Sequence, residues 1–239
     1  MSGNPRLTGI MVVPRAADKT HGLIVAQGLD IPCALGRGGV VRRKREGDGA
    51  TPAGRLALLA VLYRADRLRR PATALPVMPI APDAGWCDDP TDRRYNRPVR
   101  LPCAARHERL WRSDGLYDVV VVLDYNFRRP RPGAGSAVFL HIAAPDFSPT
   151  EGCVAVSMTA MRRLLSRAGP GTWLDVGWHR GLVGSKRSAA RRLVKDTRCN
   201  SLPLVAPYDR EPPSLDICRH RIAVRLSHAS VPNPTFVSG

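Results

Sequence analysis

The sequence predicts a mainly β fold of the α+β type, in which short strands and tight turns accompany a single helix. Proline and glycine are plentiful, with 22 and 21 of the 239 residues, whereas aromatic residues make up only 5%. This composition favours short strands and many turns over long helices. Apolar runs of strand length recur along the chain, and each ends at a turn signal. A helical apolar period occurs in one segment, after residue 153.

Three strands are expected within residues 7–35, where LTGIMVV, GLIVAQG and IPCALG each precede a turn signal. Residues 43–54 are charged and rich in glycine, which predicts a loop. RLALLAVLYR, residues 55–64, contains β-branched and aromatic residues, so we expect a further strand there. Because leucine and alanine also suit a helix, this alternative stays open for that segment.

Residues 69–115 are polar and rich in proline, and they predict a long insertion loop. An insertion of this length without regular structure is uncommon and often functional. LYDVVVVLDYN, residues 116–126, is a nearly continuous apolar run, typical of a strand that is buried on both faces. AVFLHIA, residues 137–143, is expected to form the next strand, with His141 near its C-terminal end.

The helix is expected shortly after Cys153. Ser157 suits the N-cap position, and Gly169 followed by Pro170 marks the end of the helical pattern. TWLDVG, residues 172–177, then reads as a closing strand. The apolar residues that would share one face of the helix are Met158, Met161, Leu164, Leu165 and Ala168.

A change of character after Gly177 divides the chain. Residues 5–177 contain all the elements above and predict one folded domain. Residues 178–239 show no sustained period and contain eleven basic against four acidic residues. We therefore expect a basic, disordered C-terminal tail with one short helix at 186–195.

The formal net charge is +17, and arginine supplies most of it. Such a charge favours association with polyanions or acidic substrates. A coding bias of the organism explains an arginine-rich composition equally well. Since aromatic residues are few and are not interleaved with the arginines, no specific nucleic-acid partner is expected.

Six cysteines are widely spread, and no two of them form a C-x-x-C pair. A disulfide framework is not expected in a chain of this length without a secretory signal. Cys199, Cys218 and His220 lack the paired short spacings of a structural zinc site, so no metal is expected. No apolar run approaches the roughly 20 residues of a membrane span. No signal peptide is visible, and the sequence by itself indicates the cytoplasm.

His141 and Cys153 lie twelve residues apart, on either side of a loop that Pro145 and Pro149 stiffen. A thiol is a poor nucleophile until it is deprotonated, and a neighbouring imidazole can take its proton and leave an ion pair. The histidine must then be held in one tautomer, which a backbone carbonyl at the strand end can do. Gly152 permits a tight turn that exposes backbone N–H groups to an oxyanion. A histidine and a cysteine at this spacing are more often two unrelated core residues.

SAVFLHIAAPDFSPTEGCVAV resembles the signature of the L,D-transpeptidase (YkuD) catalytic domain family, in which a histidine precedes a spacer and Ser/Thr-His-Gly-Cys. KREGDGATPAGRL, residues 44–56, resembles the charged, glycine-rich stretch that precedes Thr-Pro-x-Gly in this family. VVVLDYN, a glycine-rich turn and the histidine strand also follow the family's order. The resemblance covers roughly residues 7–177 and implies a β-sandwich or barrel with a long insertion loop and one helix after the nucleophile. It identifies residues 5–177 as an L,D-transpeptidase-like catalytic domain.

The resemblance implies roles for individual residues. Cys153 would be the nucleophile and His141 the proton donor and acceptor. The carbonyl of Ile142 would orient the imidazole, and the N–H groups of Gly152 and Cys153 would bind the oxyanion. Peptidoglycan stem peptides are the implied partners, joined into 3-3 cross-links by acyl transfer through a cysteine thioester. No metal or organic cofactor is implied, and the implied compartment is the cell envelope or periplasm.

The chain departs from the family pattern near the nucleophile. The spacer is shorter than usual, no basic or amide side chain stands near position 155, and Glu151 replaces the usual histidine. A carboxylate there should raise the pKa of the thiol, unless it points to solvent or pairs with an arginine. Two alternatives therefore stay open: hydrolysis of stem peptides at the same site, as an L,D-carboxypeptidase or endopeptidase, and an inactive protein that binds the cell wall or polyanions.

Candidates for substrate binding are Arg97, Arg100 and Glu151. A guanidinium group can bind a stem-peptide carboxylate through two hydrogen bonds, which favours the two arginines. His107 is expected to be a surface histidine.

Overall fold

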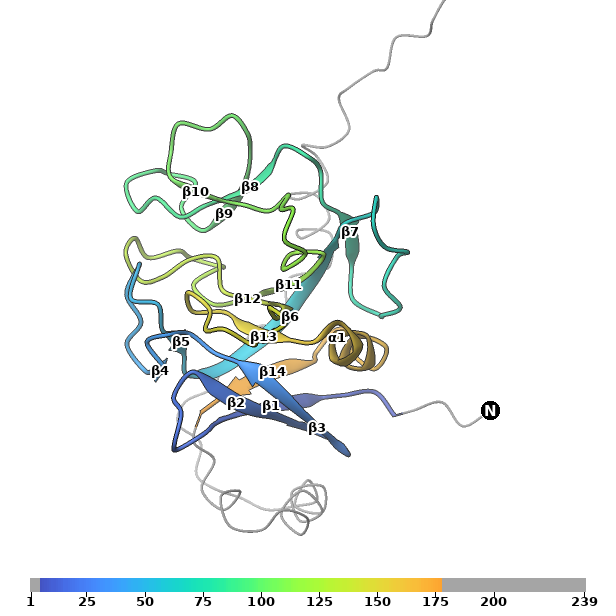
Figure 1. Cartoon of the computed structure of the whole chain (residues 1–239). Coiled ribbons are helices and arrows are strands. Elements are labelled where there is room, and N and C mark those ends of the chain that lie inside the picture. The colour runs from blue at the N-terminus through green and yellow to red at the C-terminus, as the bar shows by residue number, and fades with distance from the viewer. Residues whose placement is uncertain (1–4, 178–239) are drawn as a thin grey trace, which may run out of the picture. The chain divides into compact units, whose positions relative to one another are not determined.

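The computed structural model describes residues 5–177. Its framework is a nine-stranded sheet in the order β11-β12-β13-β3-β2-β1-β14-β6-β7. Because β11 also pairs with β6, the strands from β11 round to β6 close into a barrel-like ring, with β7 attached outside it (Figure 1). The strands of the ring are β1 (Gly9–Pro14), β2 (His21–Ala26), β3 (Leu29–Ala34), β6 (Gly54–Tyr63), β11 (Val119–Leu123), β12 (Phe139–Ile142), β13 (Val154–Val156) and β14 (Trp173–Val176).

These elements confirm the mainly β class and most of the predicted strands. The three strands expected within residues 7–35 form the antiparallel run β1-β2-β3. The segment that left strand and helix open is the strand β6, which pairs with β14 and β11. The predicted loop at 43–54 is largely a loop, bounded by the short strands β4 (Val40–Val41) and β5 (Thr51–Pro52), which pair in parallel.

Strand β11 is buried on both faces, as its uninterrupted apolar run predicts. Val119, Val121 and Leu123 face the core inside the ring, whereas Val120 and Val122 belong to a second apolar cluster. This alternation follows from the two-residue period of a strand. The strand lies between two apolar cores rather than at the surface, which explains why its sequence is apolar at every position.

The insertion at 69–115 is not the structureless loop that its composition predicts. It contains β7 (Val77–Pro79), β8 (Ala84–Cys87), β9 (Arg97–Arg100) and β10 (His107–Arg109). β8 pairs antiparallel with both β9 and β10 in a separate three-stranded sheet. Each strand has only three or four residues, and β7, β9 and β10 carry proline or charged side chains, so the alternation is too short to recognise in the sequence.

The second apolar cluster joins this small sheet to the ring. Trp86 and Leu110 from the insertion pack with Phe139 of β12 and with Cys153. Trp86 meets the Phe139 ring edge-on, with 5.1 Å between the ring centroids. The insertion therefore covers the part of the ring where the candidate histidine and cysteine lie.

The helix α1 (Met158–Leu165) begins where its capping signal predicts. The Ser157 hydroxyl accepts a hydrogen bond from the Ala160 N–H, and Met161, Leu164 and Leu165 are buried against the ring core. Gly169 and Pro170 follow a few residues after the helix ends, so they end the helical pattern but do not cap it.

The tail predicted for residues 178–239, its helix at 186–195, and Cys199, Cys218 and His220 lie outside the residues that the structure describes. Within residues 5–177, no helix has the length and apolar character needed to cross a bilayer.

Candidate active site

Cys153 stands immediately before β13, beside the N-terminal end of β12. The parallel pairing of these strands places Leu140 opposite Val154 and His141 opposite Ala155. The Phe139 N–H donates to Cys153 Sγ over 3.3 Å, and the thiol donates to the Ala137 carbonyl over 3.2 Å. Both bonds fix the sulfur against the start of β12, with the residue only 8% exposed.

The turn that presents Cys153 depends on Gly152. Its φ is +127°, a conformation that side chains rarely allow. A Cβ atom here would lie 2.7 Å from the Ala50 carbonyl oxygen. Thr150 Oγ1 accepts the Gly152 N–H over 3.2 Å and donates to the Cys153 carbonyl over 2.7 Å. The turn is thus closed by one hydroxyl and packed against residues of the loop that precedes β5.

His141 lies near the end of β12, as its position in the apolar run predicts, and it is buried. Its Nδ1 lies 2.8 Å from the Ile142 carbonyl oxygen. Because a carbonyl can only accept, Nδ1 carries the proton and Nε2 keeps a free lone pair. Tyr117 packs edge-on against the imidazole, with 5.1 Å between the ring centroids. The ring is therefore held in one tautomer and one orientation.

His141 and Cys153 line the same groove, whose volume is about 480 Å³. The wall includes Tyr117 and Leu116 from the chain entering β11, and Thr150 from the turn before the cysteine. Its charged side chains are of both signs and nearly balance one another: acidic Glu46, Asp88, Glu108 and Glu151, and basic Lys44, Arg106 and Arg112.

The environment keeps both candidate groups uncharged at neutral pH. Burial raises the pKa of the Cys153 thiol to about 12, although the Phe139 N–H opposes this change. Burial also lowers the pKa of His141 to about 4, against the effect of the Ile142 carbonyl. Both pKa shifts disfavour the thiolate–imidazolium ion pair that the sequence suggested. Both groups are therefore neutral near pH 7, and the hydrogen-bond partners of the thiol are the Phe139 N–H and the Ala137 carbonyl rather than His141.

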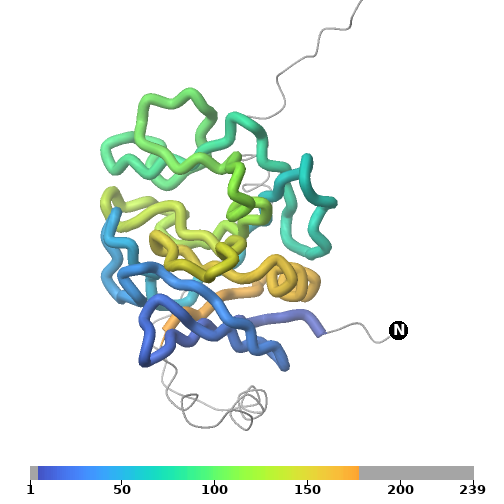
Figure 2. Tube along the Cα trace, viewed as in Figure 1, coloured from blue at the N-terminus to red at the C-terminus, as the bar shows by residue number. Residues whose placement is uncertain are grey.

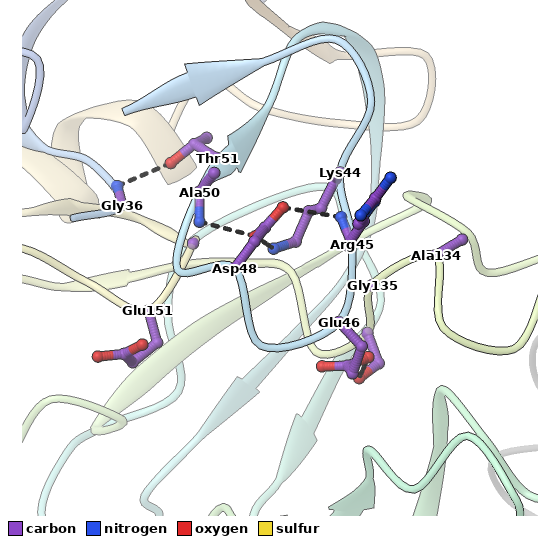
Figure 3. A network of polar contacts seen from close by, with 12 residues as sticks. Gly36, Lys44, Arg45, Glu46, Asp48, Ala50, Thr51, Ala134, Gly135 and Glu151 are labelled. Atoms are coloured by element: carbon purple, nitrogen blue, oxygen red, sulfur yellow. Dashed lines mark hydrogen bonds and ion pairs between the residues drawn. The ribbon is translucent and has the colours of Figure 1, made fainter. Parts of the chain in front are cut away.

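Lys44 brings a buried positive charge to this site. Its Nζ donates to Asp48 Oδ1 over 2.7 Å, and its side chain is 4% exposed. Burial alone would raise the pKa of Asp48, but hydrogen bonds from the Arg45 and Ala50 N–H groups and from Lys44 lower it. Figure 3 shows this network beside the turn that holds Glu151. The ammonium group lowers the pKa of the Cys153 thiol, in opposition to its burial.

Glu151, the residue that replaces the family's histidine, pairs with an arginine. The Arg37 Nε donates to both of its carboxylate oxygens, over 2.9 and 2.8 Å. The two side chains are 59% and 75% exposed, and the Glu151 carboxylate is directed away from Lys44 (Figure 3). The carboxylate that raises the pKa of the thiol is instead Glu108, which comes from β10.

Glu108, Arg112, Tyr117 and Lys44 were not identified from the sequence. Glu108 and Arg112 lie in the polar insertion, where many charged residues look alike. Lys44 lies in the segment that resembles the family, but nothing in its spacing indicates that it is buried. These residues line the same groove as Cys153. The packing of the insertion and of the loop at 43–54 brings them there, and no local pattern in the sequence shows this.

Arg97 and Arg100, the two arginines predicted for substrate binding, are not among the described residues that line the groove. Arg97 donates to the Asn96 carbonyl and lies over the Phe127 ring. Arg100 faces Asp83 over 3.8 Å. His107 Nδ1 lies 2.8 Å from the Ala105 carbonyl oxygen. Across residues 5–177 there is no group of three or more histidine, cysteine or carboxylate side chains placed to hold a metal ion.

Comparison with known protein families finds a match for this sequence. The model of the YkuD family, the L,D-transpeptidase catalytic domain, matches residues 18–176. No curated protein matches the chain. Among solved structures, Bd1075 of Bdellovibrio bacteriovorus is 14% identical with a TM-score of 0.39, covering 82% of this chain and 57% of that chain. L,D-transpeptidase 1 of Mycobacterium tuberculosis is 11% identical with a TM-score of 0.31, covering 70% of this chain and 61% of that chain.

This chain therefore spans less than two thirds of the length of either solved structure. The family match covers most of residues 5–177 and includes the histidine strand, the cysteine turn and the Thr-Pro-Ala-Gly segment. The chain belongs to the L,D-transpeptidase (YkuD) family.

Proposed function

We propose that this protein is a peptidoglycan L,D-transpeptidase that forms 3-3 cross-links through a thioester on Cys153. The observation that carries the proposal is the hydrogen bond between His141 Nδ1 and the Ile142 carbonyl. It leaves Nε2 free to take a proton, within the groove that also holds the thiol. The family membership supports the reaction type.

In the first step, His141 Nε2 takes the thiol proton while Sγ attacks the carbonyl carbon of the donor stem at its L,D-bond. The bond to the terminal D-alanine breaks, and its amine leaves with the proton from His141. In the second step, the amine of another stem attacks the thioester, and the thiolate leaves and regains a proton. No metal or organic cofactor takes part in this proposal.

The negative charge on the carbonyl oxygen needs hydrogen-bond donors in both steps. The proposal assigns this task to the N–H groups of Gly152 and Cys153. The Gly152 N–H now donates to Thr150 Oγ1 over 3.2 Å, a long bond that a charged oxygen can replace. Lys44 adds a buried positive charge next to this turn and stabilises negative charge on sulfur or oxygen.

The groove does not resemble a polyanion-binding surface. Its charged residues are four acidic and three basic, although the whole chain carries a net charge of +17. A balanced lining suits a substrate with both carboxylate and ammonium groups, which peptide stems of peptidoglycan contain. Because Glu151 pairs with Arg37, its presence does not by itself argue for an inactive protein. Since such stems lie in the cell envelope, the proposal also places the activity there.

The test is acylation by a carbapenem, followed by intact mass. The wild type should gain one drug molecule, and Cys153→Ala should gain none. Cys103→Ser is the matched control, since it removes a more exposed thiol that is not among the residues lining the groove. Labelling that survives in Cys153→Ala would reject the nucleophile.

The products then separate transfer from hydrolysis. With tetrapeptide muropeptides, transfer gives a cross-linked dimer, whereas hydrolysis gives only the trimmed tripeptide. Release of D-alanine without any dimer would favour the carboxypeptidase alternative. His141→Ala should lose both products, and retained cross-linking in that variant would dismiss the base.

A further inference from the structure

Glu108 is a carboxylate in an unfavourable place for the first half of the reaction. It lines the groove with Cys153 and His141, and its negative charge raises the pKa of the thiol. A charge that hinders thiolate formation does not help acylation. Once the thioester has formed, the sulfur carries no charge and this repulsion disappears. The position of Glu108 therefore suits the second half of the reaction.

Arg112 and Tyr117 hold the Glu108 carboxylate in place at the groove. Arg112 Nη1 donates to Glu108 Oε1 over 3.1 Å, and the Tyr117 hydroxyl forms a further hydrogen bond with the carboxylate. Burial raises the pKa of Glu108, and both partners oppose this rise. The side chain is 31% exposed, so one side of the carboxylate faces the groove.

The other acidic residues of the groove, like Glu108, accept hydrogen bonds from neighbouring side chains. Glu46 accepts hydrogen bonds from Tyr95 and from Ser136. Asp88 pairs with Arg106 over 3.1 Å. Glu151 is held through both oxygens by Arg37. Glu108 is the acidic residue of the lining whose charge acts on the thiol.

We propose that Glu108 binds the ammonium group of the acyl acceptor and positions its nitrogen for attack on the Cys153 thioester. The inference rests on the proposed function and names the acceptor subsite of the same groove. A carboxylate forms its strongest hydrogen bonds with cationic donors. Arg112, beside Glu108, is also bound to Asp114, so its charge is already paired and the ammonium group is the part of the acceptor that this cluster can bind.

In the transfer step the acceptor nitrogen loses two protons, and one of them returns to the sulfur. The acceptor ammonium gives one proton to Glu108, and the nitrogen lone pair forms the new bond to the thioester carbonyl carbon. The C–S bond breaks and its electron pair goes to Sγ. His141 carries the second amine proton to Sγ, which restores the thiol. Glu108 then releases its proton to water.

The experiment compares wild type, Glu108→Gln and the control Asp83→Asn in the full chain. A tetrapeptide donor is mixed with D-methionine as the amine acceptor, and the amide and acid products are quantified by mass spectrometry. Glu108→Gln should form the thioester at least as fast as the wild type. Its ratio of amide to acid should fall about tenfold, because the acceptor loses a charged partner. Asp83→Asn removes an acidic side chain of the same insertion that faces Arg100 and is not among the residues lining the groove, so it should keep the wild-type ratio.

A second readout separates a binding role from a structural one. Glu108→Gln should lower the pKa of the Cys153 thiol, measured by alkylation rate against pH, and Asp83→Asn should not. An unchanged product ratio in Glu108→Gln would overturn the inference, and so would loss of thioester formation in that variant alone. Failure of the wild type to form a thioester at Cys153 would instead reject the proposed function.

The wild type provides a test if Glu108→Gln does not fold. D-methionine carries an ammonium group at neutral pH, whereas hydroxylamine is neutral there. The rate with D-methionine should saturate and fall as salt is added, and the rate with hydroxylamine should do neither. Equal behaviour of the two acceptors would overturn the inference.

Discussion

At the scale of single residues, burial keeps Cys153 and His141 in their neutral forms at neutral pH. Burial raises the pKa of Cys153 and lowers that of His141, so each group prefers its neutral form. The Ile142 carbonyl sets the tautomer, which means that the base is oriented before it is needed. Reactivity toward a bound carbonyl then depends on the transfer of the proton during attack rather than on a stored thiolate.

This resting state predicts slow alkylation. At neutral pH, iodoacetamide should modify Cys153 at least about tenfold more slowly than free cysteine, and the rate should still rise above about pH 9. Peptide mapping by mass spectrometry measures the rate at Cys153 separately from that at Cys103. Fast alkylation near pH 6 that disappears in His141→Ala would show a resting ion pair and contradict the prediction.

The neutral histidine also predicts how the stability of the fold depends on pH. The pKa of His141 is 6.5 in its ordinary state and about 4 in the fold, so the unfolded chain binds the proton first. Stability should therefore be complete above about pH 6.5 and should fall as the pH drops toward 4, by about 3 kcal/mol from this group. Urea unfolding at several pH values measures the loss.

His141→Gln is the control, because it keeps a polar side chain that does not titrate. Its free energy of unfolding should lack this part of the dependence on pH. An identical acid slope in both proteins would mean that other groups cause it.

At the scale of elements, the turn from Thr150 to Cys153 depends on two distant segments. The Arg37 N–H donates to the Thr150 carbonyl over 2.9 Å, and the Ala50 carbonyl lies against Gly152. Figure 2 shows the chain around residue 45 running beside the chain that leads to β12, where the Glu46 N–H donates to the Gly133 carbonyl over 2.9 Å. Cys153, the proposed nucleophile, is thus positioned by loops rather than by its own strand.

Gly152→Ala tests this support. The new Cβ would lie 2.7 Å from the Ala50 oxygen at a φ of +127°, so we expect a loss of about 3 kcal/mol in stability and the loss of thioester formation. Gly171→Ala is matched to it, because Gly171 also has a positive φ, of +85°, but nothing lies within 4 Å of its Cβ position. That variant should lose only about 1 kcal/mol and should acylate normally. If both variants lost the same stability in thermal unfolding, close packing around Gly152 would not be the cause.

At the scale of the whole molecule, the sequence predicted what is local and missed what packing creates. The β1-β2-β3 run, β11, the histidine strand and the capped helix each carry their own periodicity or turn signal. The strands of the insertion are too short to show one. For the same reason the cysteine and histidine were visible in one stretch of sequence, while Glu108 and Lys44 reach them from separate segments.

The distribution of charge makes a prediction at this scale. The chain carries +17, but the groove is nearly balanced, so a polyanion should bind away from the nucleophile. Retention on heparin should fall as salt rises, and it should be equal for wild type and Cys153→Ala. Added heparin should leave carbapenem acylation unchanged within about twofold. Strong competition between the two would place the polyanion in the groove.

The use of a main-chain oxygen to orient the imidazole has a consequence for mutagenesis. Triads that rely on an aspartate or asparagine lose their third member when that side chain is exchanged. Here every amino acid at position 142 would supply the same backbone oxygen. Substitutions of the Ile142 side chain would therefore report only its packing in the core, and not the orientation of the imidazole. Replacing the amide linkage after Ile142 by an ester, which weakens the carbonyl as an acceptor, would reveal the contribution that such substitutions overlook.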